Sequence, residues 1–117
     1  MRYQVAPLFC RPWTLNGMSA QLIESHYEHD YGGAVQRLNA IDEEIETLEA
    51  TGATPSAIHR LKRDELDLLN STLLHELYFA SLGGDGRAIP ERMREALTGD
   101  FGSVNEWRKQ FMTMGPG

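Results

Sequence analysis

Several features that mark other protein classes are scarce or missing in this 117-residue sequence. The single cysteine, Cys10, excludes an intrachain disulfide and favours a reducing compartment. No apolar run approaches the roughly eighteen residues of a membrane helix, and the N-terminus lacks an apolar run followed by a small-residue cleavage site. We therefore expect a cytoplasmic protein that has no signal peptide and does not contact a membrane.

Positive charge is also in deficit, since 11 Lys and Arg stand against 17 Asp and Glu, for a formal net charge of −6. Proteins that bind phosphate backbones need a basic face, so nucleic acid is not an expected partner. The 41% hydrophobic and 24% charged content is ordinary for a globular protein of one domain.

No convincing strand pattern and no internal repeat is present, whereas helical periodicity is strong. Pro7, Pro12 and the turn residues "LNG" predict an extended arm over residues 1–17. Ser19 can cap a helix that reaches Ala50, with a kink or a close helix approach near Gly32-Gly33. The apolar stripe of this first helix consists of Tyr27, Tyr31, Val35, Leu38, Ile41, Ile45 and Leu48.

After the breaker "ATGATPS", a second helical region is predicted from Ser56 to about Leu82, with a break near "KRDE" as the alternative. It carries two neighbouring apolar stripes, Leu61, Leu66, Leu69, Leu73 and Leu77 in one and Leu68, Thr72, His75, Phe79 and Leu82 in the other.

Two short helices are expected beyond the turn "GGDG". One starts at Pro90 and runs to about residue 98, and the other starts at the capping box Ser103–Glu106, with Trp107 and Phe111 burying one side. The predicted fold is all-α: an extended N-terminal arm (1–17), a long antiparallel helical hairpin (18–82) and two short C-terminal helices (83–117).

Four histidines are present, and two of them lie close to apolar stripes. His29 and His59 have charged neighbours and are expected to face water. His26 and His75 fall on different arms of the hairpin, so both imidazoles can point into the same core. They are either core histidines hydrogen-bonded to the backbone or metal ligands. A local site from His26, His29 and Asp30 is a further alternative, since residues three and four apart share a helix face.

The order and spacing of several segments resembles the iron/manganese superoxide dismutase family. These segments are "ESHYEHDYGGAVQRLN", "LNSTLLHELYFASLGGDG" and "GDFGSVNEWRKQF", preceded by the proline-containing arm. The resemblance covers nearly the whole chain. It implies an N-terminal helical hairpin and a C-terminal α/β domain that hold one iron or manganese between them.

Family members ligate this metal with three histidines, one aspartate and a solvent molecule, and convert superoxide to oxygen and hydrogen peroxide. By position, the resemblance makes His26 the first histidine ligand and His75 the second. The remaining two ligands belong to a C-terminal half that these residues do not contain. We therefore expect a truncated, proteolysed or split protein whose metal site is incomplete, or empty in this chain alone.

The resemblance also assigns Asp30, Tyr31, Ser71 and Phe79 to positions behind the ligands or along the substrate funnel. The family usually has histidine where Asp30 stands and tyrosine where Ala34 stands. Asp30 would place negative charge near the entry of an anionic substrate. Ser71 stands where iron-type members often carry a glutamine that reaches the metal-bound solvent, and serine is too short to do so.

Two functional hypotheses follow. The first is the helical part of a superoxide dismutase-like protein, which would dismutate superoxide poorly or not at all without the missing half. The second is a non-catalytic helical module that self-associates, either around a metal site made by His26 and His75 of two chains or without metal.

Overall fold

The computed structural model describes residues 2–116, so Met1 and Gly117, the ends of the predicted arm and of the last predicted segment, lie outside it. Residues 2–116 form helices and loops with no strand, which confirms the all-α prediction. The chain divides into two compact units, which we call the hairpin unit (Met1–Gly83) and the C-terminal unit (Gly84–Gly117). Among the helices of residues 2–116, none combines the length and the apolar character needed to cross a bilayer.

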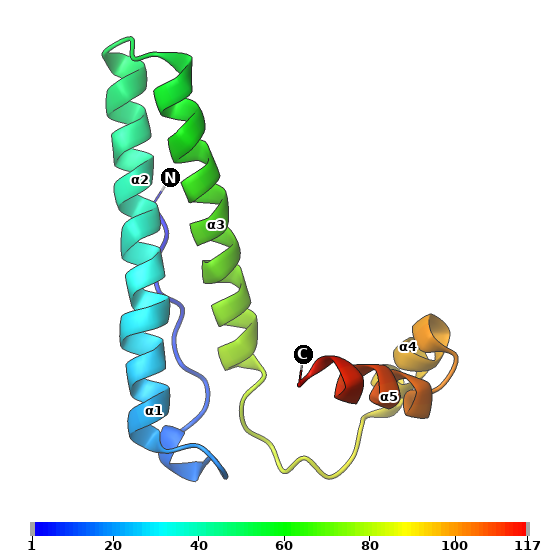
Figure 1. Ribbon diagram of the computed structural model, residues 1–117. Coiled ribbons are helices and arrows are strands. Elements are labelled where there is room, and N and C mark those ends of the chain that lie inside the picture. Colours follow the sequence, from blue (N-terminus) through cyan, green and yellow to red (C-terminus); the bar gives the residue numbers. More distant parts are fainter. Residues whose placement is uncertain (1, 117) are drawn as a thin grey trace. The chain divides into compact units, whose positions relative to one another are not determined.

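The hairpin unit is built from two long helical rods (Figure 1). The first rod joins α1 (Ala20–Ser25), η2 (His26–Tyr31) and α2 (Gly32–Ala50) without a gap, and α3 (Pro55–Ala80) returns beside it. The hydroxyl of Ser19 accepts a hydrogen bond from the backbone N–H of Leu22 at 3.1 Å, so the predicted cap is present.

The irregularity predicted near the glycine pair lies immediately before it, at residues 26–31. η2 is a π-helical turn, in which backbone hydrogen bonds join residues five apart instead of four. Gly32 is the first residue of the regular helix that follows, and its φ of −58° is one that any residue adopts. The distortion therefore belongs to residues 26–31, next to His26, and not to the glycines.

The second rod, α3, runs unbroken through "KRDE", so the alternative of a break there is wrong. The Lys62 ammonium lies 3.0 Å from the Glu65 carboxylate across one turn, a pairing that supports the helix locally. Of the two predicted stripes, the one with Thr72 and Phe79 is buried. The other is buried at Leu61 and stays largely outside beyond it, with Leu66 56% and Leu77 69% exposed.

The arm, here residues 2–11, packs along the first rod. Side chains of the rod make hydrogen bonds with the backbone of the arm. The amide side chain of Asn39 accepts from Tyr3 N–H at 2.7 Å and donates to Tyr3 C=O at 2.9 Å. Tyr3 and Leu8 also pack against the core cluster of Ile23, Tyr31, Val35 and Phe79. One helical turn, η1 (Pro12–Thr14), interrupts the predicted extended segment, because proline fits the first position of a helical turn.

The C-terminal unit consists of α4 (Glu91–Phe101) and α5 (Val104–Met114). α4 extends three residues past its predicted end and stops at Gly102, whose φ of 86° suits glycine. The Ser103 hydroxyl accepts from Glu106 N–H at 3.0 Å, which is the predicted cap of α5. The rings of Trp107 and Phe111 lie 5.5 Å apart, but Phe111 is 62% exposed, so this face is only partly covered.

Candidate metal centre

His26 and His75 lie opposite each other on the two rods of the hairpin. Their ring centroids are 5.1 Å apart, with the ring planes nearly perpendicular. His26 is the first residue of η2, and its ring also contacts that of Phe79, at a centroid distance of 5.1 Å. Both histidines are half-buried, so one edge of each ring remains reachable from outside.

The hydrogen bonds of His75 decide which of its nitrogens can bind a metal. Its Nδ1 lies 2.7 Å from the backbone oxygen of Ser71, which can only accept. Nδ1 therefore carries a proton and donates it, and in the neutral ring Nε2 then keeps its lone pair. A second ring nitrogen fixed in this way is how metal-binding histidines are usually oriented. The Ser71 hydroxyl lies 3.3 Å from the same nitrogen, so the side chain of Ser71 contacts His75 as well as its backbone oxygen does.

The two rings open onto a shallow hollow of about 200 Å³, which we call the histidine notch. It is lined by His26, Leu74, His75 and Tyr78. Leu74 is 66% exposed, so the rim of the notch is apolar on the side that faces outward. The two imidazoles are therefore the polar groups among the side chains that line this hollow, apart from the Tyr78 hydroxyl.

Tyr31 is buried behind the histidines, at 1% exposure, with its ring stacked on His75 at 6.0 Å. Its hydroxyl accepts from Ala6 N–H at 2.8 Å and donates to the Glu76 carboxylate at 2.9 Å. Burial is the main factor that raises the pKa of Tyr31, and the Glu76 carboxylate adds to it, although the Ala6 N–H acts in the opposite direction. The hydroxyl is thus a fixed link between the arm and α3.

The other predicted site residues lie in different environments. Phe79 is buried in the core and contacts the rings of both Tyr27 and Tyr31. Asp30 is exposed. Ala34, where the family resemblance implies a tyrosine of the substrate funnel, is fully buried.

Within residues 2–116, no three His, Cys, Asp or Glu side chains gather closely enough to hold a metal ion. The alternative site of His26, His29 and Asp30 is therefore not assembled, although these residues share one helix. His29 and His59 are both exposed. The chain offers two imidazoles at the notch.

Sequence reasoning missed Glu76 and Tyr78. Tyr78 lines the notch, and the Glu76 carboxylate accepts a hydrogen bond from the Tyr31 hydroxyl. Tyr78 follows His75 by three residues in "LLHELYF" and so shares its helix face, which was the available signal, whereas Glu76 is only adjacent in sequence and no spacing indicated it.

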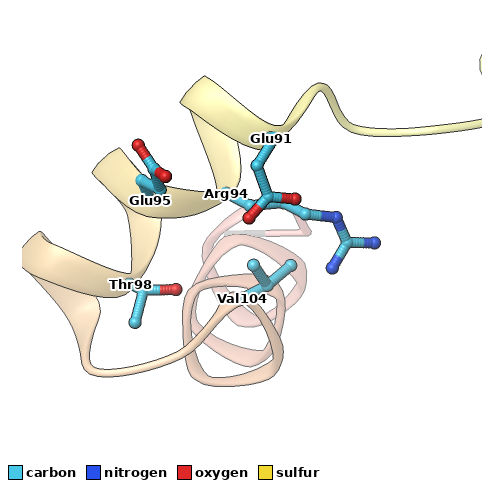
Figure 2. Close-up of a pocket in the computed structure, with 5 residues that line it drawn as sticks. All are labelled: Glu91, Arg94, Glu95, Thr98 and Val104. Atoms are coloured by element: carbon cyan, nitrogen blue, oxygen red, sulfur yellow. The ribbon is translucent and has the colours of Figure 1, made fainter.

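A larger hollow of about 570 Å³ lies in the C-terminal unit between α4 and α5 (Figure 2). Glu91, Arg94, Glu95, Thr98 and Val104 line it. The glutamates and Arg94 are exposed on α4, and charges in that setting are stabilised by water. The chemistry of the two imidazoles, and not cavity size, makes the histidine notch the stronger candidate.

The fold and the notch define a helical hairpin with two half-buried histidines on facing rods, and sequence comparison gives this hairpin a family context. No protein-family profile matches the chain. It is 47% identical over 115 residues to the iron superoxide dismutase of Cupriavidus metallidurans, which covers 98% of this chain and 58% of that protein.

The iron superoxide dismutases of Aquifex aeolicus and Aquifex pyrophilus are each 30% identical over 101 residues, or 81% of this chain and 47% of theirs. The chain is therefore a homologue of the iron superoxide dismutases, which confirms the resemblance. It spans between about half and three fifths of the length of the relatives it matches.

Proposed function

We propose that His26 and His75 are two ligands of an iron or manganese site in a superoxide dismutase-like protein, and that protein outside residues 2–116 supplies the others. The observation that carries this proposal is the pair of rings 5.1 Å apart, with Nδ1 of His75 engaged by Ser71. Imidazole suits both metals. When bound, such a metal supplies one-electron chemistry by alternating between trivalent and divalent states, with superoxide as substrate.

The chain's own residues have separate tasks in this proposal. Ser71 holds His75 in the tautomer that presents Nε2. Phe79 packs against the His26 ring, with the centroids 5.1 Å apart, and limits its rotation. Leu74 and Tyr78 form the rim of the notch beside the two imidazoles.

Two neutral histidines hold such metals weakly, and no carboxylate joins them among residues 2–116. We therefore expect this chain alone to dismutate superoxide poorly or not at all. The outward stripe of α3, with Leu66, Leu73 and Leu77 exposed, supports a further polypeptide covering this side. The metal identity follows the iron of the relatives, with manganese as the family's other choice.

Metal content measured by elemental analysis tests the ligand assignment. Because a two-histidine site holds iron weakly, the purified chain is dialysed anaerobically against excess Fe²⁺, and the iron bound at equilibrium is compared with that of His75→Ala, His26→Ala and His59→Ala. His59 lies on the same helix as His75 but is exposed, so it is the matched control. Loss of iron in the first two variants alone supports the proposal. Equal iron in all four proteins, or none in the parent chain, overturns it.

Complementation tests the dismutase activity. The part of the Cupriavidus metallidurans enzyme that this chain does not match is produced separately and mixed with it. We expect superoxide dismutation to rise well above that of either piece, and to vanish with His75→Ala. No gain in activity on mixing, with both pieces folded, would argue against the dismutase function.

A second candidate function is that of a non-catalytic homo-oligomer. For either candidate we propose a cytoplasmic location, because a single cysteine, Cys10, fits a reducing compartment. The exposed leucines of α3 beside the notch favour the homo-oligomer, since a twofold dimer could bring four histidines together. Mass in solution together with metal stoichiometry separates the candidates. One metal per two chains, with a dimeric mass, supports the shared site.

A further inference from the structure

The π-helical turn η2 places two side chains against His75 that a regular helix would separate. Residues five apart lie about 140° apart around an α-helix, but about one turn apart where i→i+5 hydrogen bonds form. His26 and Tyr31 are five apart and span η2. As a result both rings reach His75, with centroid distances of 5.1 Å from His26 and 6.0 Å from Tyr31.

The hydroxyl of Tyr31 then connects three segments that are distant in the sequence. It accepts a hydrogen bond from the N–H of Ala6 in the arm and donates one to the carboxylate of Glu76, which follows His75 in α3. The other polar group of the same alanine, its C=O, accepts from the Tyr27 hydroxyl at 2.6 Å. The two tyrosines therefore hold one residue of the arm, but of the two only Tyr31 hydrogen-bonds to α3.

We propose that Tyr31 is a positioning residue: its hydroxyl couples the docking of the arm at Ala6 to the placement of Glu76 and His75, and so to the geometry of the histidine notch. The link to metal binding rests on the proposed function of His75. The mechanical coupling does not, because it needs only the contacts of the metal-free chain.

The contacts make the coupling specific. Tyr31 is almost fully buried, so loss of its hydroxyl leaves both Ala6 N–H and the Glu76 carboxylate without that partner. A half-buried carboxylate deprived of its donor gains by turning toward water, and His75 precedes it on the same helical turn. The Tyr31 ring, retained in phenylalanine, would continue to fill the core.

Amide hydrogen exchange in the metal-free chain tests the coupling, with Tyr31→Phe compared with the matched control Tyr27→Phe. Both variants lose one hydrogen bond to Ala6. Tyr31→Phe is expected to raise exchange about tenfold both in the arm and in α3 around His75, whereas Tyr27→Phe raises it in the arm alone. Equal behaviour of the two variants, with α3 unaffected, overturns the proposal.

Variants of Glu76 test the same link from its other end and remain informative if Tyr31→Phe fails to fold. Glu76→Leu removes the acceptor and should raise exchange at Ala6, a residue with which Glu76 shares no described hydrogen bond. Glu76→Gln keeps an oxygen that can accept a hydrogen bond from Tyr31. In this variant the exchange rate at Ala6 should stay at that of the parent chain. If the leucine variant leaves Ala6 as protected as in the parent chain, the coupling does not exist.

Titration with Co²⁺, followed by visible absorption, gives the metal-linked readout. Tyr31→Phe and Glu76→Leu should weaken Co²⁺ binding about tenfold or more, as loss of a group supporting a ligand does, while Tyr27→Phe and Glu76→Gln stay within about twofold. Unchanged affinity in all four variants overturns the link to the notch. If the parent chain binds no Co²⁺, the proposed function of His75 fails, and the exchange comparison still decides the coupling.

Discussion

The hairpin unit and the C-terminal unit are both helical, but they are held together differently. The hairpin unit buries a cluster of Ile23, Tyr31, Val35 and Phe79 contributed by both rods. In the C-terminal unit, no residue of α4 or α5 is buried. The first therefore depends on contacts between segments far apart in the sequence, and the second on caps and neighbouring turns.

Charge separates the two units as well. The hairpin unit has six Lys and Arg against twelve Asp and Glu, and the C-terminal unit has five of each. The whole formal charge of −6 thus lies on the hairpin unit. Electrostatic self-repulsion works against the packing of that unit only, and its apolar core has to outweigh it.

The largest expected effect comes from truncating a core ring. Phe79→Ala removes a side chain that is 3% exposed and contacts His26, Tyr27 and Tyr31. We expect the hairpin unit to lose about 3–5 kcal/mol of unfolding free energy, the usual cost of Phe→Ala in a core. Urea unfolding followed by residue-resolved NMR measures this loss.

Phe111→Ala, in the C-terminal unit, is the matched control because that ring is 62% exposed. Its cost should stay below about 1 kcal/mol, since little apolar area is removed from contact. Similar losses for both substitutions would mean that the C-terminal unit has a core of its own and that the comparison of the two units is mistaken.

Much of the fold could be predicted because its signals are local. The two long helices follow from apolar spacing, and the caps at Ser19 and Ser103 follow from one side chain and the N–H three residues on. Periodicity did not say which of the two stripes of α3 faces α2. Both stripes have helical spacing, and the choice depends on how the partner helix packs.

The site was predictable only in part, for the same reason. The hairpin brings His26 and His75 to the same place once two antiparallel rods are assumed. The arm contacts at Tyr31 and Asn39 join residues 25 and 36 positions apart in the sequence. No local pattern encodes such contacts. The π turn was hidden too, because "HYEHDY" fits an ordinary helix as well.

Removal of a helix cap has a smaller expected effect and sharpens the comparison. Ser103→Ala removes the acceptor of Glu106 N–H and should destabilise α5 by about 1 kcal/mol. With no buried residue to hold α5, amide exchange should rise along its whole length. Ser19→Ala removes the equivalent bond to Leu22 but should affect only the first turn of α1, which continues into the packed rod. Exchange confined to the first turn in both variants would contradict this difference.

The smallest effect concerns the acidic surplus of the hairpin unit. Burial, followed by the hydrogen bond and charge of Glu65, raises the pKa of Asp42, while Lys62 counteracts them. A raised pKa means that the folded state binds this proton more tightly than the unfolded state does. The stabilisation from protonated Asp42 is therefore complete at acid pH and is lost as the pH rises through the folded pKa.

Asp42→Asn, which mimics the protonated carboxyl, should consequently stabilise the hairpin unit near neutral pH by less than about 1 kcal/mol, since the group is only partly buried. The gain should vanish below the ordinary carboxyl pKa of about 3.9. Lys62→Met should act in the opposite direction, because it removes the cation that offsets Glu65. Urea unfolding between about pH 3 and about pH 8 measures both variants. The prediction fails if the unfolding free energies of Asp42→Asn and the parent chain differ by the same amount over this whole range. Asp42 would then ionise alike in the folded and unfolded chain, and the surplus negative charge would not destabilise the hairpin unit at this position.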